Sequence, residues 1–184
     1  MDKRIRKTKH ALYAAFFQLR AKKEIRAIKI AELCQTADIN KTTFYAHYKD
    51  IYELADDVER QLLFEITDSI PKDVAYTFEN PEVYTRAVTE AFAQRTRELE
   101  ILFSGSEFPK LGLYLEQVIK QAVFAKRPHL KDDAELQVLL SYCIHGAFHA
   151  QMSNRNLPLE TVMAVTERIL VAMRPLMRTY ERQP

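Results

Sequence analysis

Residues 28–54 of the chain read IKIAELCQTADINKTTFYAHYKDIYEL. Within them Ile30, Leu33 and Cys34 recur at helical spacing, which predicts a first helix that buries these three side chains. Residues 37–39 then interrupt the pattern, and Asn40 is a good N-cap for a second helix over residues 41–47. This part of the chain therefore predicts two short helices joined by a tight turn and followed by the start of a further helix.

The second short helix carries side chains suited to DNA. Phe44 is expected to pack inward, and the exposed face is expected to carry Lys41, Thr42, Thr43 and Tyr45. Hydroxyl and lysine side chains near the start of a helix reach base edges and phosphates when that helix enters a DNA groove. An ordinary helical hairpin is the alternative interpretation.

The run Phe44-Tyr45-Ala46-His47-Tyr48-Lys49 follows a helix and a three-residue turn and precedes Leu54. In this setting it resembles the DNA-binding segment of the tetracycline-repressor (TetR) family of bacterial transcription regulators. The resemblance covers roughly the first 55 residues, and the rest of the chain is similar to the family only in length and helical pattern.

Three positions depart from the family pattern. Asp38 stands where Gly is usual, and Asp adopts the left-handed backbone conformation more readily than most residues. Lys29 replaces a common Ser or Thr cap, and Ile51 replaces a phosphate-binding lysine. No DNA contact is therefore assigned to Ile51.

The resemblance implies a dimeric regulator, more typically a repressor than an activator, that binds double-stranded DNA at a palindromic operator. The predicted DNA-binding residues come from the second short helix, its flanks and the basic N-terminal segment, and are Lys3, Arg4, Lys7, Lys29, Asn40, Lys41, Thr42, Thr43, Tyr45, His47 and Lys49. Lys9 belongs to the same basic cluster, which is predicted to lie over phosphates; a solvated N-terminus is the alternative.

Composition favours an all-α fold. The 184 residues include only three glycines, which leaves no Gly-rich phosphate loop and few of the tight turns that an all-β fold needs. We expect a three-helix, helix-turn-helix DNA-binding domain over residues 1–49 and a helical regulatory and dimerisation domain over residues 50–184. Helices are predicted from residue 3 to 23, from 51 to 66, from about Pro81 onward, from Leu111 to Lys126, from about Asp132 to Ser153 and from about Pro158 to Thr179, the last one interrupted or kinked at Pro175. Residues 98–112 are expected to contain a break.

Charge and cysteine content bound the function further. Residues 1–49 hold 12 Lys and Arg against 4 Asp and Glu, a net charge of +8, and the remaining 135 residues hold 15 against 21, a net charge of −6. This asymmetry is typical of a protein that presents one end to a polyanion. Two cysteines on separate predicted helices, no membrane-spanning apolar run and no signal peptide together predict a cytoplasmic protein.

The two C-terminal helices are predicted to form a four-helix bundle with those of a second copy, because their apolar stripes are too wide to be covered within one small domain. The expected homodimer interface consists of Ile144, Phe148, Val162, Val165, Ile169 and Met173.

The regulatory domain is also expected to bind a small hydrophobic or aromatic effector, as in relatives of this family. The predicted lining is mainly aromatic and is formed by Leu62, Phe64, Ile66, Tyr84, Phe103, Phe108, Tyr114, Tyr142 and His145. The helix over residues 50–66 is expected to transmit effector binding to the DNA-binding domain.

Other chemistry is weighed against this interpretation. His145 and His149 are four residues apart, a spacing that can bind a metal, but no acidic partner lies nearby in sequence, and neutral polar groups at a seam or pocket are the alternative. A helical hydrolase would need a nucleophile beside a base, and no such spacing occurs. We predict no metal, no cofactor and no enzymatic activity. A helical dimerisation module without DNA binding, or an activator that responds to a partner protein, remains the alternative.

Overall fold

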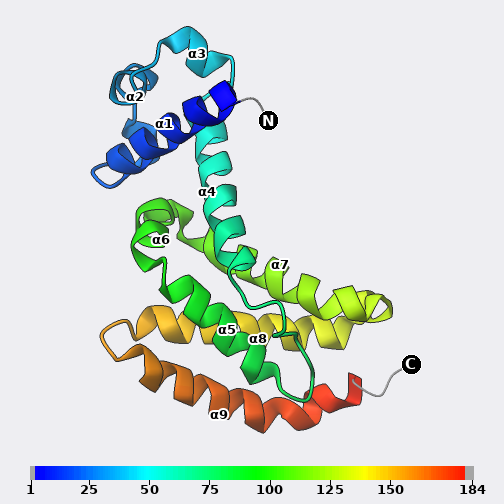
Figure 1. Cartoon of the computed structure of the whole chain (residues 1–184). Helices are drawn as coiled ribbons and strands as arrows, with labels where there is room; N and C mark the ends of the chain where they lie inside the picture. Colours follow the sequence, from blue (N-terminus) through cyan, green and yellow to red (C-terminus); the bar gives the residue numbers. More distant parts are fainter. Residues whose placement is uncertain (1–2, 181–184) are drawn as a thin grey trace. The chain divides into compact units, whose positions relative to one another are not determined.

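The computed structural model describes residues 3–180, with side chains from Ile5 onward. Nine α-helices and no strand occur in this range (Figure 1), so the predicted all-α fold is confirmed. The described chain divides into two compact units: unit 1 comprises residues 3–66 and 95–107, and unit 2 comprises residues 67–94 and 108–180. The predicted boundary between residues 49 and 50 does not coincide with a boundary of these units.

Unit 1 is built from α1 (Lys3–Arg20), α2 (Ile30–Thr36), α3 (Lys41–Tyr45), α6 (Thr96–Leu102) and all but the last two residues of α4 (Ile51–Asp68). Helix α1 packs against α2 and α6, and α2 packs against α3. The side chains buried at the centre are apolar and recur at helical spacing, and they include Leu12, Phe16, Leu33, Phe44, Leu54, Val58 and Leu102.

A buried arginine joins the first and last segments of unit 1. Arg20 is 7% exposed, and its Nη2 donates to the carbonyl oxygens of Leu102 at 3.4 Å and Ser104 at 3.2 Å. These carbonyls lie at the end of α6, where helix carbonyls lack partners of their own. Helix α1 ends at Arg20, three residues before the predicted end at residue 23.

Unit 2 is built from α5 (Pro81–Ala93), α7 (Phe108–Lys126), α8 (Ala134–Ser153) and α9 (Leu159–Met177). Helix α8 packs against both α7 and α9, and α9 packs against α5. Asp133 caps α8 by accepting a hydrogen bond from the Leu136 amide at 2.9 Å. Asn80 occupies the N-cap position of α5 but its side chain makes no capping bond, so Pro81 at the first helical position is the stronger local signal there.

The predicted break within residues 98–112 is a short connection between α6 and α7. Gly105 has a φ of +64°, a conformation that costs glycine little, and it opens a 3-10 turn over Gly105–Glu107. Pro109 does not interrupt a helix, because it lies in the first turn of α7, where its missing N–H costs no hydrogen bond. Pro175 lies inside α9 and does not interrupt it, because the helix continues to Met177.

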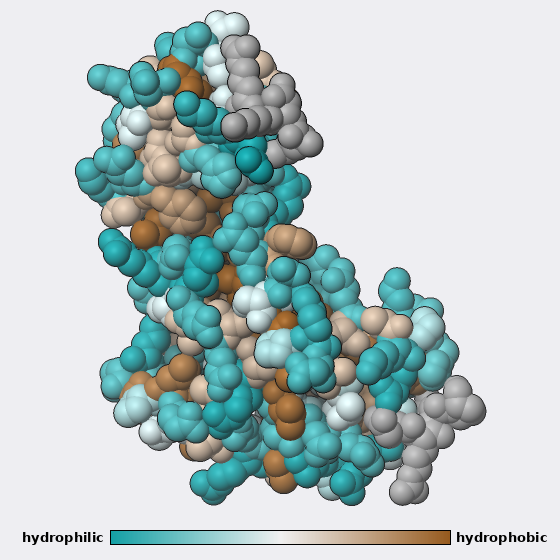
Figure 2. Space-filling view, in the orientation of Figure 1, coloured by the Kyte–Doolittle hydropathy of each residue, from teal (hydrophilic) through white to brown (hydrophobic). Residues whose placement is uncertain are grey.

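Within the part of the chain that the structure describes, none of the helices combines the length and the apolar character needed to span a membrane. In Figure 2, hydrophobic side chains are interspersed among hydrophilic ones on the surface over α9.

Candidate functional site

Helices α2 and α3 are joined by a turn that two local backbone hydrogen bonds define. Asp38 has a φ of +53°, the left-handed conformation that the sequence required of it. The Ile39 amide donates to the Cys34 carbonyl at 3.0 Å, and the Asp38 amide donates to the Gln35 carbonyl at 3.3 Å. This is the Schellman arrangement that ends a helix. It sets the direction in which α3 leaves α2.

Capping fixes the start of α3. Asn40 Oδ1 accepts a hydrogen bond from the Thr43 amide at 2.7 Å, as expected of an N-cap. Phe44 is 0% exposed, whereas the next residue, Tyr45, is 56% exposed. Lys41 and Thr42 are exposed and Thr43 is half-buried. The helix therefore presents a polar face with one aromatic ring to solvent, and it ends at Tyr45 rather than at the predicted His47.

A four-residue polar cluster holds the segment after α3 against α1 and α4. Asp57 Oδ2 on α4 accepts hydrogen bonds from Lys9 Nζ at 2.8 Å, Tyr13 OH at 2.7 Å and Tyr48 OH at 2.6 Å. We call these residues the Asp57 cluster. Lys9, a member of the basic cluster that is predicted to lie over phosphates, is bonded to Asp57 in the free chain.

The hydrogen bonds of the Asp57 cluster shift the pKa values of its members. Burial raises the pKa of Asp57, but the bonds from Lys9, Tyr48 and Tyr13 outweigh burial and hold this pKa at about 2. Burial and the bond to Asp57 raise the pKa of Tyr13 to about 12, and the same two causes raise the pKa of Tyr48. The carboxylate is thus ionised and both phenols are neutral at pH 7.

Three hydrogen bonds fix the start of α4. Asp50 Oδ1 accepts from the amides of Tyr52 and Glu53, both at 2.9 Å, and Glu53 Oε2 accepts from the Lys49 amide at 2.7 Å. Asp50 therefore caps α4.

The other predicted DNA-binding residues have varied positions. Lys7, Lys29 and Lys49 are exposed, and Lys29 is at the N-cap position of α2 without a side-chain capping bond. His47 is half-buried, with its ring centroid 6.4 Å from that of Tyr48. The side chains of Lys3 and Arg4 lie outside the described residues. Ile51 is 8% exposed and packs inward.

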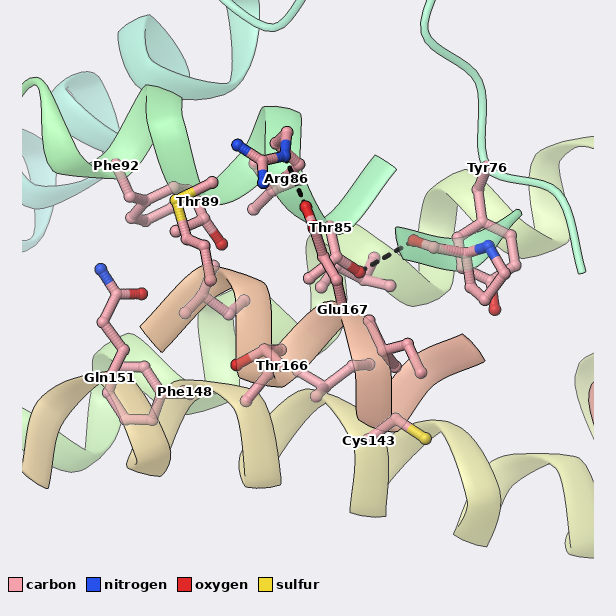
Figure 3. Close-up of a pocket in the computed structure, with 18 of the residues that line it drawn as sticks. Tyr76, Thr85, Arg86, Thr89, Phe92, Cys143, Phe148, Gln151, Thr166 and Glu167 are labelled. Atoms are coloured by element: carbon pink, nitrogen blue, oxygen red, sulfur yellow. Dashed lines mark hydrogen bonds and ion pairs between the residues drawn. The ribbon is translucent and has the colours of Figure 1, made fainter. Parts of the chain in front are cut away.

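Unit 2 contains a cavity of about 70 Å³ between α5, α7, α8 and α9 (Figure 3). Most of its lining is apolar and comes from residues such as Val88, Phe92, Ile144, Phe148 and Leu170. Its polar side chains are Tyr76, Thr85, Arg86, Thr89, Gln151, Thr166 and Glu167. Since a water molecule needs roughly 10–15 Å³ of such space, the cavity can hold a few waters or one small molecule.

An ion pair closes one part of the cavity wall. Arg86 Nε on α5 donates to Glu167 Oε1 on α9 at 2.5 Å. The same guanidinium lies 3.2 Å from Glu160 and 3.6 Å from Glu90. Three carboxylates thus surround one arginine, so this part of the wall has an excess of negative charge.

None of the nine predicted effector-binding residues lines this cavity. Leu62, Ile66 and Phe103 are buried within unit 1, and Phe64 of the same unit is 62% exposed. Within unit 2, Tyr84 packs beside Tyr76, Phe108 stacks on Phe148 at 5.4 Å, Tyr114 is half-buried and Tyr142 is 69% exposed. The prediction selected mainly aromatic rings, whereas three of the seven polar side chains in the wall are threonines. Thr85 and Thr89, four residues apart beside Val88 and Phe92, were the available signal.

His145 takes part in a second polar cluster, between α7 and α8. Its Nε2 lies 3.0 Å from Glu116 Oε2, and Lys120 Nζ lies 2.6 Å from Glu116 Oε1 and donates to Ser141 Oγ at 2.9 Å. Hydrogen bonds from Lys120, Ser141 and His145 lower the pKa of Glu116 to about 2. The rings of His145 and His149 are 6.5 Å apart. Among the described residues, no three His, Cys, Asp or Glu side chains are placed to hold a metal ion.

The six predicted interface residues separate into two groups. Ile144, Phe148 and Val162 are at most 9% exposed and line the cavity, so their assignment to the surface of the chain is corrected. Val165 and Ile169 are 49% and 53% exposed, and Met173 is half-buried, with its sulfur 3.7 Å from Cys143 Sγ. The helical pattern alone did not distinguish the apolar face that packs within the same chain from the apolar face that is exposed to solvent.

Comparisons of this chain with protein-family models, with curated proteins and with solved structures find no match.

Proposed function

We propose that this protein is a DNA-binding transcriptional regulator that acts as a homodimer and responds to a small molecule held in the cavity of unit 2. The observation that carries the proposal is the exposed polar face of α3. The Schellman turn, the Asn40 cap and the Asp57 cluster hold this face in one orientation. The sign of regulation, repression, follows from the resemblance to the TetR family.

The chemistry of α3 supports contact with base edges as well as phosphates. Lys41, Thr42 and Tyr45 offer an ammonium and two hydroxyls on the exposed side of one short helix. Such groups hydrogen-bond to base edges in the major groove, while exposed lysines on either side neutralise phosphates. Lys29 and Lys49 are in that position, and residues 1–49 carry a net charge of +8.

The proposed homodimer rests on an apolar surface formed by α8 and α9. The side chains that form it are Val138 and Tyr142 on α8, and Val165, Ile169 and Leu176 on α9; α9 also exposes Leu159 and Val171. Their spacing by four and seven residues places each set along one face of its helix. Cys143, which follows Tyr142, touches Met173, so both stripes border the same contact between α8 and α9. A second copy would cover this surface and form a four-helix bundle.

The DNA-binding part is tested by binding to selected operator fragments and to random DNA at two salt concentrations. Thr42→Ala or Thr43→Ala should cost about 1–3 kcal/mol on operator DNA if the hydroxyl contacts a base. Lys49→Ala should weaken binding to both DNAs alike and reduce the salt slope by about one. Lys126→Ala, an exposed lysine at the end of α7, is the matched control and should change neither. Equal losses on both DNAs for every α3 variant would exclude base recognition by α3.

The dimer is tested by sedimentation. Ile169→Glu would place an uncompensated charge in the α8–α9 surface and should shift the protein toward monomer. Leu113→Glu is the control, because Leu113 is 62% exposed on α7 and lies outside this surface. A monomeric parent protein would exclude the homodimer. The dimer further predicts a palindromic operator with half-sites a whole number of turns apart, each turn being about 10 base pairs.

The cavity suggests how a ligand could act on the dimer. Helices α8 and α9 form part of the cavity wall and also carry the exposed apolar surface. A ligand that changes the packing of α8 against α9 would therefore change the geometry of the dimer and the spacing of its two α3 helices. A coupling of roughly 1–3 kcal/mol would lower operator affinity about 5- to 150-fold, and operator DNA must weaken ligand binding by the same factor. Calorimetry of a ligand with and without operator measures this reciprocity.

A further inference from the structure

We propose that the cavity of unit 2 selects a small, uncharged, mainly apolar molecule with one amide or hydroxyl group, which hydrogen-bonds to Thr89 and Gln151. This inference deepens the proposed function, since it names the chemical class of the effector. It can be tested by a direct ligand-binding measurement that needs no DNA.

The unused hydrogen-bonding capacity of the cavity is concentrated in two side chains. Thr85 and Thr166 each donate to a carbonyl of their own helix, at Pro81 and Val162, both at 2.9 Å. Thr89 and Gln151 also line the cavity, but their side chains have no hydrogen-bond partner within residues 3–180. Figure 3 draws Thr89 beside Phe92 on α5 and Gln151 beside Phe148 on α8.

The polar atoms of Thr89 and Gln151 are accessible. In the described part of the chain, no side-chain nitrogen or oxygen that is closed off from solvent lacks a hydrogen-bond partner. Since these two side chains lack partners, their polar atoms must be reached by solvent or by a ligand. A threonine hydroxyl both donates and accepts, and so does a carboxamide. A ligand group that also does both, such as an amide or a hydroxyl, is their natural complement.

The charges of the cavity wall argue against an ionic ligand. A cation would have to compete for Glu167 with the Arg86 guanidinium, which is already bonded to it at 2.5 Å. An anion near Arg86 would meet Glu167, Glu160 and Glu90, which surround the same guanidinium. Placing an unpaired charge against the apolar remainder of the wall is costly. The remaining class is a neutral molecule.

The size of the cavity limits the apolar part of the ligand. Its volume of about 70 Å³ is roughly half that of the ~150 Å³ apolar cavity that accommodates benzene in another protein. A short aliphatic chain therefore fits while the helices keep their positions.

The test uses butyramide, butyrate and butylamine, which at pH 7 are neutral, anionic and cationic molecules of similar shape. Each is titrated into the full-length protein and followed by saturation-transfer NMR. Butyramide should bind about tenfold or more tightly than either ion. Thr89→Val and Gln151→Leu should each weaken butyramide binding about three- to tenfold, the effect of one lost hydrogen bond. Thr161→Val and Gln117→Leu, at exposed positions outside the cavity, are the matched controls and should leave it unchanged.

Three results would overturn the inference: no saturable binding of butyramide, binding of butyrate or butylamine as tight as that of butyramide, or unchanged butyramide affinity in both cavity variants. Circular dichroism of each variant checks that its fold is intact. This test separates the ligand hypothesis from the proposed function. If the protein binds butyramide through Thr89 and Gln151 but binds no DNA, the ligand class is supported and the regulatory role is excluded.

Discussion

The two compact units differ in what surrounds their directed polar bonds. In unit 1, such bonds join elements that pack on a shared apolar core: Asp57 binds three side chains, and Arg20 binds two carbonyls at the end of α6. In unit 2, polar bonds also join the helices, for example Arg86 to Glu167 and His145 to Glu116, but a cavity of about 70 Å³ remains among these helices. Directed bonds fix an orientation, whereas a cavity leaves room for side chains and helices to move. Unit 1 is thus suited to presenting a fixed surface and unit 2 to changing its packing.

The largest expected effect is the loss of the aromatic core of unit 1. Phe44→Ala should lower the free energy of unfolding by about 3–5 kcal/mol, because Phe44 is fully buried and the small helix α3 has little other apolar anchorage. Urea denaturation with hydrogen exchange resolved by unit measures this loss. Tyr45→Ala, at the exposed neighbouring position, should change stability by less than about 0.5 kcal/mol. Similar losses in the two variants would show that α3 does not rest on Phe44.

The next largest effect is expected at Asp57. Asp57→Asn removes the charge that accepts three hydrogen bonds and should cost about 1.5–3 kcal/mol, the range for hydrogen bonds to a charged group. Faster amide hydrogen exchange, which reports weaker protection, should be confined to unit 1. Asp73→Asn, at an exposed position in unit 2, serves as the control.

The stabilisation that Asp57 contributes should depend on pH in a definite direction. The pKa of Asp57 is lowered to about 2 in the folded protein, and it lies near 3.9 in an unfolded chain. Its stabilisation is therefore complete above about pH 4 and is lost as the pH falls toward 2. The difference in unfolding free energy between the parent and Asp57→Asn should shrink over that interval. A difference that stays constant down to pH 2 would exclude the ionised carboxylate as its source.

The same alanine-to-leucine substitution should have different effects on stability in the two units. Ala55 on α4 is 2% exposed in the unit 1 core, so Ala55→Leu should destabilise by about 1–3 kcal/mol through overpacking. Ala147 on α8 is half-buried and lines the cavity, so Ala147→Leu should be neutral or stabilising by up to about 1 kcal/mol. Thermal unfolding of both variants measures the contrast. Destabilisation of the same size at both sites would mean that the cavity is not available space.

The smallest expected effect compares two asparagines at N-cap positions. Asn40→Ala should cost about 1 kcal/mol, because its side chain accepts the Thr43 amide at 2.7 Å. Asn80→Ala should cost only a few tenths of that, since the Asn80 side chain makes no capping bond to α5. Denaturant midpoints of the two variants are sufficient to rank them. A larger loss at Asn80 would reverse this assignment of the caps.

Sequence reasoning succeeded where the physical cause is local. The left-handed turn at Asp38, the cap at Asn40 and the burial of Phe44 all depend on residues within a few positions of one another. It failed where the cause lies in packing between distant segments. Lys9 finds Asp57 across 48 positions, and the cavity wall takes Thr89 and Gln151 from different helices. A helical pattern gives the apolar face of each helix but not which neighbour covers it, and this explains why Ile144 and Phe148 were placed at an interface.

The bonds of Arg20 also have a consequence for how the protein is made. Unit 1 is discontinuous in sequence, because residues 95–107 complete it after 28 residues of unit 2 have intervened. While the chain emerges from the ribosome, Nη2 of Arg20 lacks its two acceptors until Leu102 and Ser104 have been synthesised, although Nη1 can already donate to the Lys23 carbonyl. A domain normally matures as a unit during synthesis, from the N-terminus first. Here unit 1 cannot complete its packing until residues 95–107 have been synthesised. The start of unit 2 is therefore already outside the ribosome when unit 1 finishes folding.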